Sequence, residues 1–308
     1  REYYISGIEA SKFDAATAYV SLDGHRSNDH APYVYKTTDN GKTWTSIAGD
    51  LPTGNVNSIR QDPIAQNLLY APAEYGFYIS LNEGTNWMKF MPNLPNVRVD
   101  DVLVHPREND LVLATHGRSI WVMDDISALQ QMAMAAPTVP TLYTPRDAVQ
   151  WKTDRRNMTE VPGSKYWTGD NMPRGTAISY YLPSAAADVL VTITNTATGD
   201  AVRTCSAEGN LGLNRFQWTL SGDPQPGGRG GGRGGRGGQA AAPAPAAPTG
   251  PTPCVAPTGG GGRGGFGRGG FGGGGIDPGV YKVALSVAGS EVGRQTFHIL
   301  EDIWLNQK

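Results

Sequence analysis

The chain has 308 residues, enough for two domains, and a formal net charge of −2 at pH 7. A balance so close to zero excludes a partner selected by bulk charge alone. The sequence contains no run of about 18 apolar residues, which excludes a membrane-spanning helix. Because it opens at Arg1 inside a strand-like run, without a signal peptide, we expect a fragment of a longer protein.

Alternating residues predict strands from the start of the chain. Two such runs, Tyr3 to Ile5 and Ala18 to Leu22, precede a polar loop over residues 23–32. A third run, Tyr33 to Tyr35, leads into a tight polar turn and then into a further strand. This arrangement is typical of a β-hairpin.

The turn of that hairpin spans the eight residues T-T-D-N-G-K-T-W. Gly41 supplies the left-handed backbone that the turn needs, and the oxygens of Thr37 and Asp39 can accept nearby backbone N–H groups. Trp44 is large and apolar enough to anchor the hairpin between two sheets. The pattern S/T-x-D-x-G-x-T-W is the Asp-box, and we expect its residues to be structural.

The Asp-box recurs 43 residues later as S-L-N-E-G-T-N-W, on Ser80, Asn82, Gly84 and Trp87. Tyr35 and Tyr78 keep the same offset, as do Pro63 and Pro106. A fixed period of about 40–45 residues in strand-like sequence predicts the four-stranded blades of a β-propeller.

A third repeat runs from Val99 to Met123 and carries Asp124-Asp125 in place of an Asp-box, as expected of an atypical terminal blade. We assign residues 1–128 to about three blades of an incomplete propeller. Residues 129–172 are interrupted by prolines and are predicted to be a linker.

A second series of short alternating segments begins near Gly175, with turn signals at 198–200 and 277–279. Strands at a spacing of about 8–12 residues predict a β-sandwich over residues 173–303. Residues 224–276 interrupt it with 23 of the chain's 41 glycines, five arginines and no acidic residue. Such a segment cannot bury a core, so we expect a disordered loop.

Arginines interleaved with Phe266 and Phe271 make this insertion similar to RNA-binding tails. We favour a flexible spacer or surface-adhesive loop, because the insertion lies inside a β-domain, and nucleic acid is the lesser alternative. Cys205 and Cys254 are either a disulfide or two free thiols.

Three stretches resemble a family of large bacterial secreted proteins with sortilin-like (Vps10-type) and BNR/Asp-box repeats. They are D-G-H-R at Asp23 with A-P-Y at Ala31, E-Y-G-F-Y-I-S from Glu74, and A-T-H-G-R-S-I-W-V-M-D-D from Ala114. The likeness covers about residues 1–130. Such proteins are often labelled glycosyl hydrolases, through likeness to sialidases and xyloglucanases.

The second half is similar to a FlgD-type immunoglobulin-like domain, on Gly212 to Trp218 and Pro278 to Tyr281. The resemblance implies a secreted, periplasmic or cell-surface protein, which favours the disulfide. It also implies that the remaining blades lie in another chain or in a lost N-terminal part. An exposed edge strand near Arg1 would make a homo-oligomer an alternative.

In a propeller blade, the loops between the second and third strands share one face, where ligands usually bind. The residues of these loops include three weak candidates for a catalytic acid and base, which are Asp23, Asp29 and Glu74. The expected ligand-face residues are His25, Arg26, His116 and Arg118. His25, Asp29, His30 and His116 match no metal-binding spacing, so we expect no metal and no cofactor.

The sequence therefore predicts an all-β protein, with the C-terminal blades of a β-propeller followed by an immunoglobulin-like β-sandwich. The function that we favour is a binding or scaffold module for a glycan or protein ligand, without catalysis by this chain. The alternative is a glycoside hydrolase of sialidase or xyloglucanase type, with most of its site in the missing blades.

Overall fold

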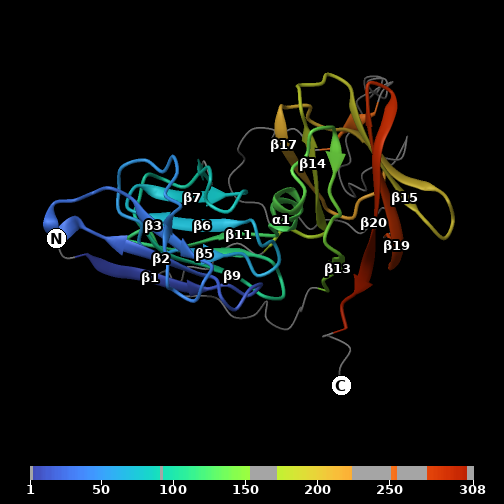
Figure 1. The fold of residues 1–308 in the computed structure, drawn as a ribbon. Coiled ribbons are helices and arrows are strands. Elements are labelled where there is room, and N and C mark those ends of the chain that lie inside the picture. The colour runs from blue at the N-terminus through green and yellow to red at the C-terminus, as the bar shows by residue number, and fades with distance from the viewer. Residues whose placement is uncertain (1–2, 91–92, 153–171, 224–250, 255–275, 304–308) are drawn as a thin grey trace, which may run out of the picture. The chain divides into compact units, whose positions relative to one another are not determined.

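The computed structural model describes residues 3–90, 93–152, 172–223, 251–254 and 276–303 (Figure 1). The chain divides into two compact units, Arg1–Pro137 and Thr138–Lys308. Both units are built almost entirely of strands, so the all-β class is confirmed. No helix among the described residues is long and apolar enough to cross a membrane.

The described residues of the first unit form three antiparallel sheets, each a run of strands that are neighbours in both sequence and space. The first sheet consists of β1 (Tyr4–Ala10), β2 (Ala18–Asp23), β3 (Tyr33–Thr37) and β4 (Thr45–Ser46). The second consists of β5 (Arg60–Gln61), β6 (Leu69–Ala73), β7 (Gly76–Ser80) and β8 (Met88–Lys89). The third consists of β9 (Val99–Val104), β10 (Leu111–Thr115) and β11 (Ile120–Met123).

The second sheet lies between the other two, as the burial of its central strands shows. Every residue of β6 and β7 is buried, whereas β2 and β10 each have one buried and one more accessible face. One apolar cluster joins Tyr19 and Val34 of the first sheet to Tyr78 of the second. Another joins Phe77 of the second sheet to Leu113 of the third. Sheets stacked face to face in this way share cores of interdigitating side chains.

The segment predicted to be a linker contains regular structure in its first half, up to residue 150. Helix α1 (Ser127–Met134) buries Leu129 and Ala133 in the core shared by the second and third sheets. Strands β12 (Thr141–Leu142) and β13 (Ala148–Gln150) belong to the sheets of the second unit. Apolar residues at helical spacing explain why α1 packs onto the first unit.

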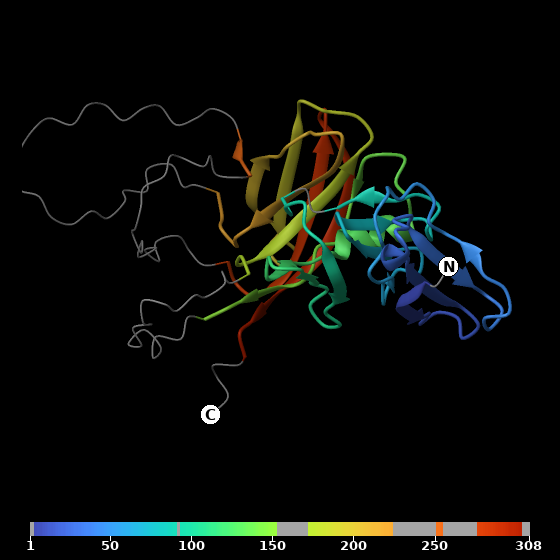
Figure 2. The same ribbon diagram turned by 90° about the vertical axis from the view of Figure 1, so that its left-hand side faces the viewer.

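The described part of the second unit forms two sheets around one core (Figure 2). The smaller sheet has the order β12, β14 (Thr176–Leu182) and β17 (Gly212–Trp218). The larger has the order β13, β20 (Ser290–Glu301), β19 (Gly279–Val287), β15 (Val189–Asn195), β16 (Ala201–Ser206) and β18 (Thr252–Pro253). Trp218, Tyr281 and Phe297 pack against one another in the core, with ring centroids 5.9–6.3 Å apart.

Most of the Gly/Arg-rich insertion lies outside the described residues, but residues 251–254 and Ile276 do not. Strand β18 pairs in parallel with β16, and Cys254 forms a disulfide with Cys205. This part of the insertion is therefore ordered, contrary to the prediction, because the disulfide and the strand pairing hold it on the sheet. The proposed RNA-binding features fall outside the described residues.

Candidate functional site

Three loops of the first unit leave the same edge of the stacked sheets, after β2, β6 and β10. The first two loops are in contact, because Gly54, beside the second loop, donates its N–H to the carbonyl of His30 over 2.8 Å. Asn57 links the second and third sheets at this edge, since its side-chain amide donates to the carbonyl of Val99 over 2.7 Å. This edge, which we name the loop edge, carries the candidate site residues.

Asp23 ends β2 and holds the start of the first loop. Its carboxylate accepts the backbone N–H of His25 over 2.8 Å and lies 2.8 Å from that residue's Nδ1. A short 3-10 helix, His25–Ser27, follows, and Asn28 closes it in a left-handed conformation with φ of 55°. Asp23 is buried, so its two oxygens serve the turn that His25 begins.

Asp29 lies between two tyrosines. The hydroxyl groups of Tyr3 and Tyr33 both donate to its Oδ2, over 3.0 and 2.9 Å, and the two rings meet edge to face at 5.0 Å. Hydrogen bonding with Tyr3 and with Asp29 raises the pKa of the Tyr33 hydroxyl. The Tyr33 hydroxyl therefore stays protonated at neutral pH and can keep donating its hydrogen bond.

Two further contacts involve the first and second loops of the loop edge. The guanidinium of Arg26 lies over the ring of Tyr4, 4.4 Å from its centroid, and donates to its hydroxyl over 2.9 Å. Glu74 approaches Nδ1 of His30 at 3.9 Å and accepts from the Asn55 amide at 3.5 Å. Both distances are at the long limit for their kind of contact, so Glu74 is held loosely.

The third loop is tied to its own sheet. His116 donates its backbone N–H to the carbonyl of Arg98 over 2.9 Å, and its ring lies 3.7 Å from Asp100. Arg118 and His116 are both exposed. Among the described residues, no group of three or more His, Cys, Asp or Glu side chains could hold a metal ion.

The residues of the first Asp-box build the turn at the opposite ends of the strands. Thr37 accepts the N–H of Gly41, and Asp39 accepts both the N–H and the hydroxyl of Thr43 over 2.9 and 2.6 Å. The Thr43 hydroxyl, with the backbone N–H groups, lowers the pKa of Asp39 to about 2. The side-chain oxygens of Thr37 and Asp39 are thus used within the turn.

The second Asp-box repeats this geometry with an amide. Ser80 accepts the N–H of Gly84 over 2.8 Å, and Asn82 accepts the N–H of Asn86 over 2.9 Å. The two turns differ at their tryptophans. Trp87 is 7% exposed and lies between sheets, whereas Trp44 is 44% exposed. The prediction that Trp44 lies between two sheets is therefore wrong for this chain, because no described sheet covers it.

One cluster that links all three sheets is absent from the sequence-based predictions. Arg60 of β5 donates to Glu9 of β1 over 3.1 Å and to Asp101 of β9 over 3.0 Å. Burial raises the pKa of Asp101, but hydrogen bonds led by that from Arg60 outweigh it, and the net pKa is lowered. The sequence signal that could have revealed this cluster is the charge of one residue in the first strand of each repeat. These residues are Glu9, Arg60 and Asp101, so a positive charge has a negative charge in the repeat on either side.

No protein-family model matches the chain, and a search of curated proteins finds no match. Solved structures do match. A GH74 enzyme from Niastella koreensis has 15% identity and a TM-score of 0.34, and the alignment covers 67% of this chain and 30% of that one. A GH74 xyloglucanase from Xanthomonas campestris has 13% identity and a TM-score of 0.33, with 72% and 31% covered.

An extracellular domain from B. thetaiotaomicron has 12% identity and a TM-score of 0.25, with 94% of this chain and 30% of that one covered. The chain thus spans about a third of the length of the structures that it matches. Values this low assign neither a family nor an activity to it.

Proposed function

We propose that this chain is a secreted or cell-envelope binding module, the last blades of an Asp-box β-propeller followed by an immunoglobulin-like sandwich. It holds a glycan or protein ligand at the loop edge and performs no hydrolysis. The up-and-down order of strands in the three stacked sheets supports the propeller, and the two sheets around one core support the sandwich. The disulfide supports an oxidising compartment.

The observation that carries the proposal is the engagement of the candidate carboxylates. Asp23 is buried against its own turn, and Asp29 accepts two tyrosine hydroxyls. These hydrogen bonds hold both carboxylates within their own loop, which supports a structural role for them. In Asp29, Oδ2 accepts both tyrosine hydroxyls and Oδ1 accepts the N–H of Ala31 over 3.2 Å, so both oxygens already serve the loop. Glu74 alone is a single carboxylate, whereas glycoside hydrolysis generally needs two.

The loop edge is better suited to binding. Tyr4 and Tyr75 are each nearly half exposed, Tyr3 is more than a third exposed, and Arg26 lies against one of these rings. Exposed aromatic faces beside fixed polar groups provide stacking surfaces for sugar rings and for peptide side chains. The hydrogen bonds of Asp29 hold Tyr3 and Tyr33 in place before a ligand arrives, which lowers the entropy cost of binding.

The test uses the purified chain with a xyloglucan oligosaccharide and a sialylated oligosaccharide as probes, followed by calorimetry and product analysis. We expect retention of a probe without release of product, and at least a tenfold loss of affinity in Tyr75→Ala. Met88→Ala, an equally exposed apolar change on β8, is the matched control and should leave affinity unchanged. Product release that disappears in a folded Asp29→Asn or Glu74→Gln variant would instead establish the hydrolase. No retention of either probe would contradict glycan binding.

A further inference from the structure

The first sheet has one covered and one uncovered face. Its register places Ile8, Val20 and Tyr35 in one row across three strands, and Ile5, Leu22 and Tyr33 in another. Directly paired residues share a face, so both rows lie on the side opposite buried Tyr19 and Val34. These six residues and Trp44 form what we name the open face.

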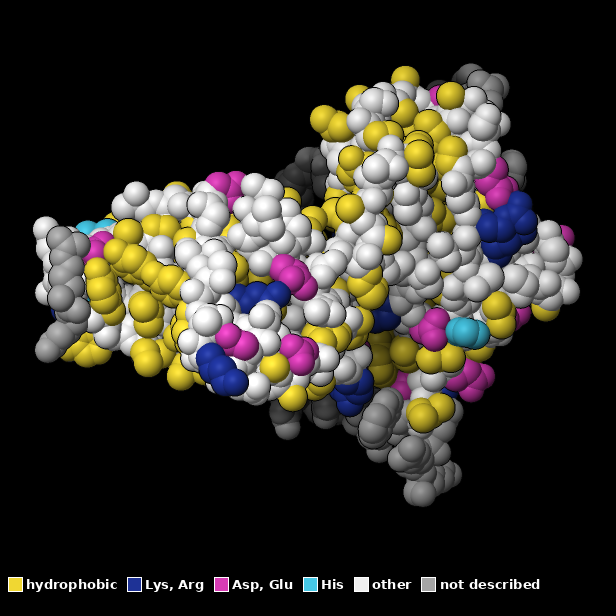
Figure 3. All heavy atoms as spheres, in the orientation of Figure 1, with side chains coloured by type: hydrophobic (Ala, Val, Ile, Leu, Met, Phe, Trp, Pro, Cys, Tyr) yellow, Lys and Arg dark blue, Asp and Glu magenta, His cyan; other side chains and the backbone are white. Residues whose placement is uncertain are grey.

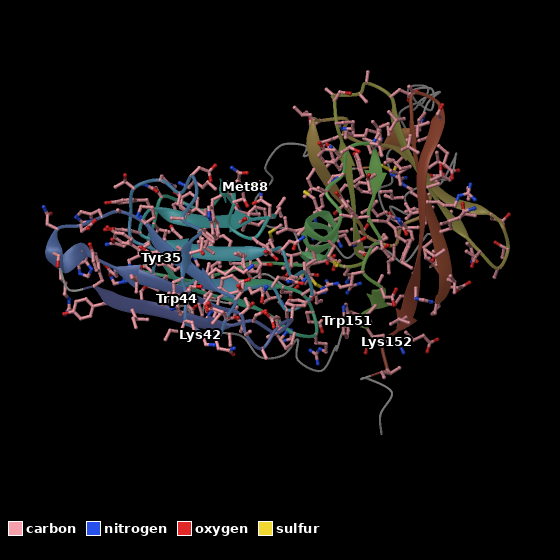
Figure 4. All side chains as sticks on the ribbon, viewed as in Figure 1. Tyr35, Lys42, Trp44, Met88, Trp151 and Lys152 are labelled. Atoms are coloured by element: carbon pink, nitrogen blue, oxygen red, sulfur yellow. A yellow bond between two sulfur atoms is a disulfide. The ribbon has the colours of Figure 1, made fainter. Side chains whose placement is uncertain are left out.

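The open face is apolar, and no sheet among the described residues covers it. Ile5 and Ile8 are 61% and 63% exposed. Figure 3 shows hydrophobic side chains gathered over β1, β2 and β3, and Figure 4 shows Tyr35 and Trp44 on the same side. A contiguous apolar sheet face of this kind usually marks an interaction surface.

The second sheet shows what covers such a face. Its Tyr78 and Trp87, which stand 43 residues after Tyr35 and Trp44, are both 7% exposed and pack on the first sheet. The indole N–H of Trp87 donates to the carbonyl of Ile47 over 2.9 Å, and its backbone N–H donates to Asp50 over 2.6 Å. We name these two hydrogen bonds the latch.

The segment that accepts the latch, residues 47–50, follows the fourth strand of the first sheet and is fitted closely to the second Asp-box. A Cβ on Gly84 would lie 2.8 Å from Ile47, and a Cβ on Gly49 would lie 2.8 Å from the carbonyl of Thr85. The first Asp-box has no such fit, since a Cβ on Gly41 would meet only Trp44, at 3.8 Å. The indole N–H of Trp44 donates within its own turn, to Gly41.

We propose that the open face takes a further four-stranded sheet of the same repeat, joined ahead of β1, whose segment after the fourth strand latches Trp44 as residues 47–50 latch Trp87. This inference rests on the proposed function in one respect, because it treats the sheets as propeller blades. It goes beyond it by naming the docking surface, the occupant and the residue that anchors the occupant.

A second copy of this chain does not offer a four-stranded sheet with a free latching segment. The outward row of its third sheet, Leu103, Val112 and Val122, is apolar too. That sheet ends at β11, however, and the chain then enters α1, so the described residues provide no fourth strand with a latching segment behind it. The second copy is therefore an alternative outcome of the test.

The chain itself supplies the probe. Gln61 and Ala10 occupy the same place in their sheets, because each pairs with the first residue of the next strand, Leu69 or Ala18. This register makes Asn55 the counterpart of Tyr4. A copy of residues 4–54 joined directly ahead of Tyr4 therefore presents a sheet and a latching segment in the observed spacing. In the copy, Trp44 is replaced by Phe so that it gives no signal.

The readout is ¹⁹F NMR of fluorotryptophan, with Trp44 assigned by Trp44→Phe in the original part. We expect the solvent isotope shift of Trp44 to fall to that of Trp87 in the extended chain. We also expect Trp44→Ala, which barely changes the Tm of the original chain, to lower the Tm of the extended chain as much as Trp87→Ala does. The matched control carries Gly49→Val in the copy, which blocks the latch and should leave Trp44 exposed.

Unchanged exposure of Trp44 in the extended chain overturns the proposal, whether or not limited proteolysis finds the copy folded. Burial of Trp44 in the original chain at rising concentration, with a doubled native mass, also overturns it in favour of a second copy. Retention of the oligosaccharide probes is measured on the same samples. Absence of retention by both the original and the extended chain, with Trp44 buried in the extended chain, contradicts the proposed function alone. Retention by the original chain with Trp44 exposed in the extended chain contradicts this inference alone.

Discussion

The two Asp-box turns have nearly the same internal hydrogen bonds and very different surroundings. In both, a hydroxyl accepts the glycine N–H, and the side chain at the third position accepts the N–H four residues later. Only the second turn rests on another sheet, through Trp87. The comparison shows that the motif specifies its own turn, whereas the place of its tryptophan depends on the neighbouring sheet.

Trp87→Ala should have the largest effect on this comparison. The substitution empties the space between two sheets and removes the hydrogen bond to Ile47. Truncation of a buried tryptophan costs about 3–5 kcal/mol of stability. Urea unfolding measures it, with Trp87→Phe as the control that keeps most of the packing. A loss below about 1 kcal/mol would show that the latch does not hold the sheets.

The next largest difference should be between the stability losses caused by Gly41→Ala and by Gly84→Ala. Both positions have positive φ, 81° at Gly41 and 88° at Gly84, so both variants pay the same strain. Only Gly84→Ala also drives a Cβ into Ile47, and overpacking of this kind costs about 1–3 kcal/mol more. Equal midpoints of urea unfolding for the two variants would mean that Ile47 moves aside freely.

Trp44→Ala should be a small change in the chain as described here. The side chain is already 44% exposed, and its indole N–H bonds only within its own turn. We expect a loss below about 1 kcal/mol, the range of surface substitutions. A thermal unfolding series beside Trp87→Ala provides the measurement. A loss as large as that of Trp87→Ala would reveal a partner for Trp44 already present in solution.

The smallest expected difference between the two turns is in their response to low pH. The pKa of Asp39 is lowered from 3.8 to about 2, whereas Asn82 in the second turn does not titrate. A lowered pKa means that Asp39 stabilises the folded turn fully above about pH 4 and loses this effect as the pH falls through about 2. NMR titration of the Thr43 amide should show this midpoint, and Asp39→Asn should abolish it. A midpoint near 3.8 would show that the hydrogen bonds from Thr43 do not form.

The sequence predicts what is local in this fold. Alternation locates most of the strands, and the turn of residues 37–44 follows from side chains within eight positions of one another. It does not predict the exposure of Trp44, because the tryptophan of the same kind of turn is buried in the second sheet and exposed in the first. Arg60 illustrates the same limit, since its partners Glu9 and Asp101 are 51 and 41 residues away.

The site could be predicted to the level of loops but not of contacts. The motifs after Asp23 and Glu74 place polar side chains at one edge of the sheets. They do not show that Tyr3, from the start of the chain, donates to Asp29. That contact requires β1 to pair with β2, which the motifs do not specify.

Hydrogen exchange of the two indole N–H groups tests the central claim most directly. NMR can follow Trp44 and Trp87 in one sample of the unmodified chain, with each assigned by its Phe variant. The account predicts slow exchange at Trp87, which is latched to Ile47 between sheets, and exchange at least a hundredfold faster at Trp44. Equal protection of the two groups would contradict it, because the two turns would then have equivalent neighbours.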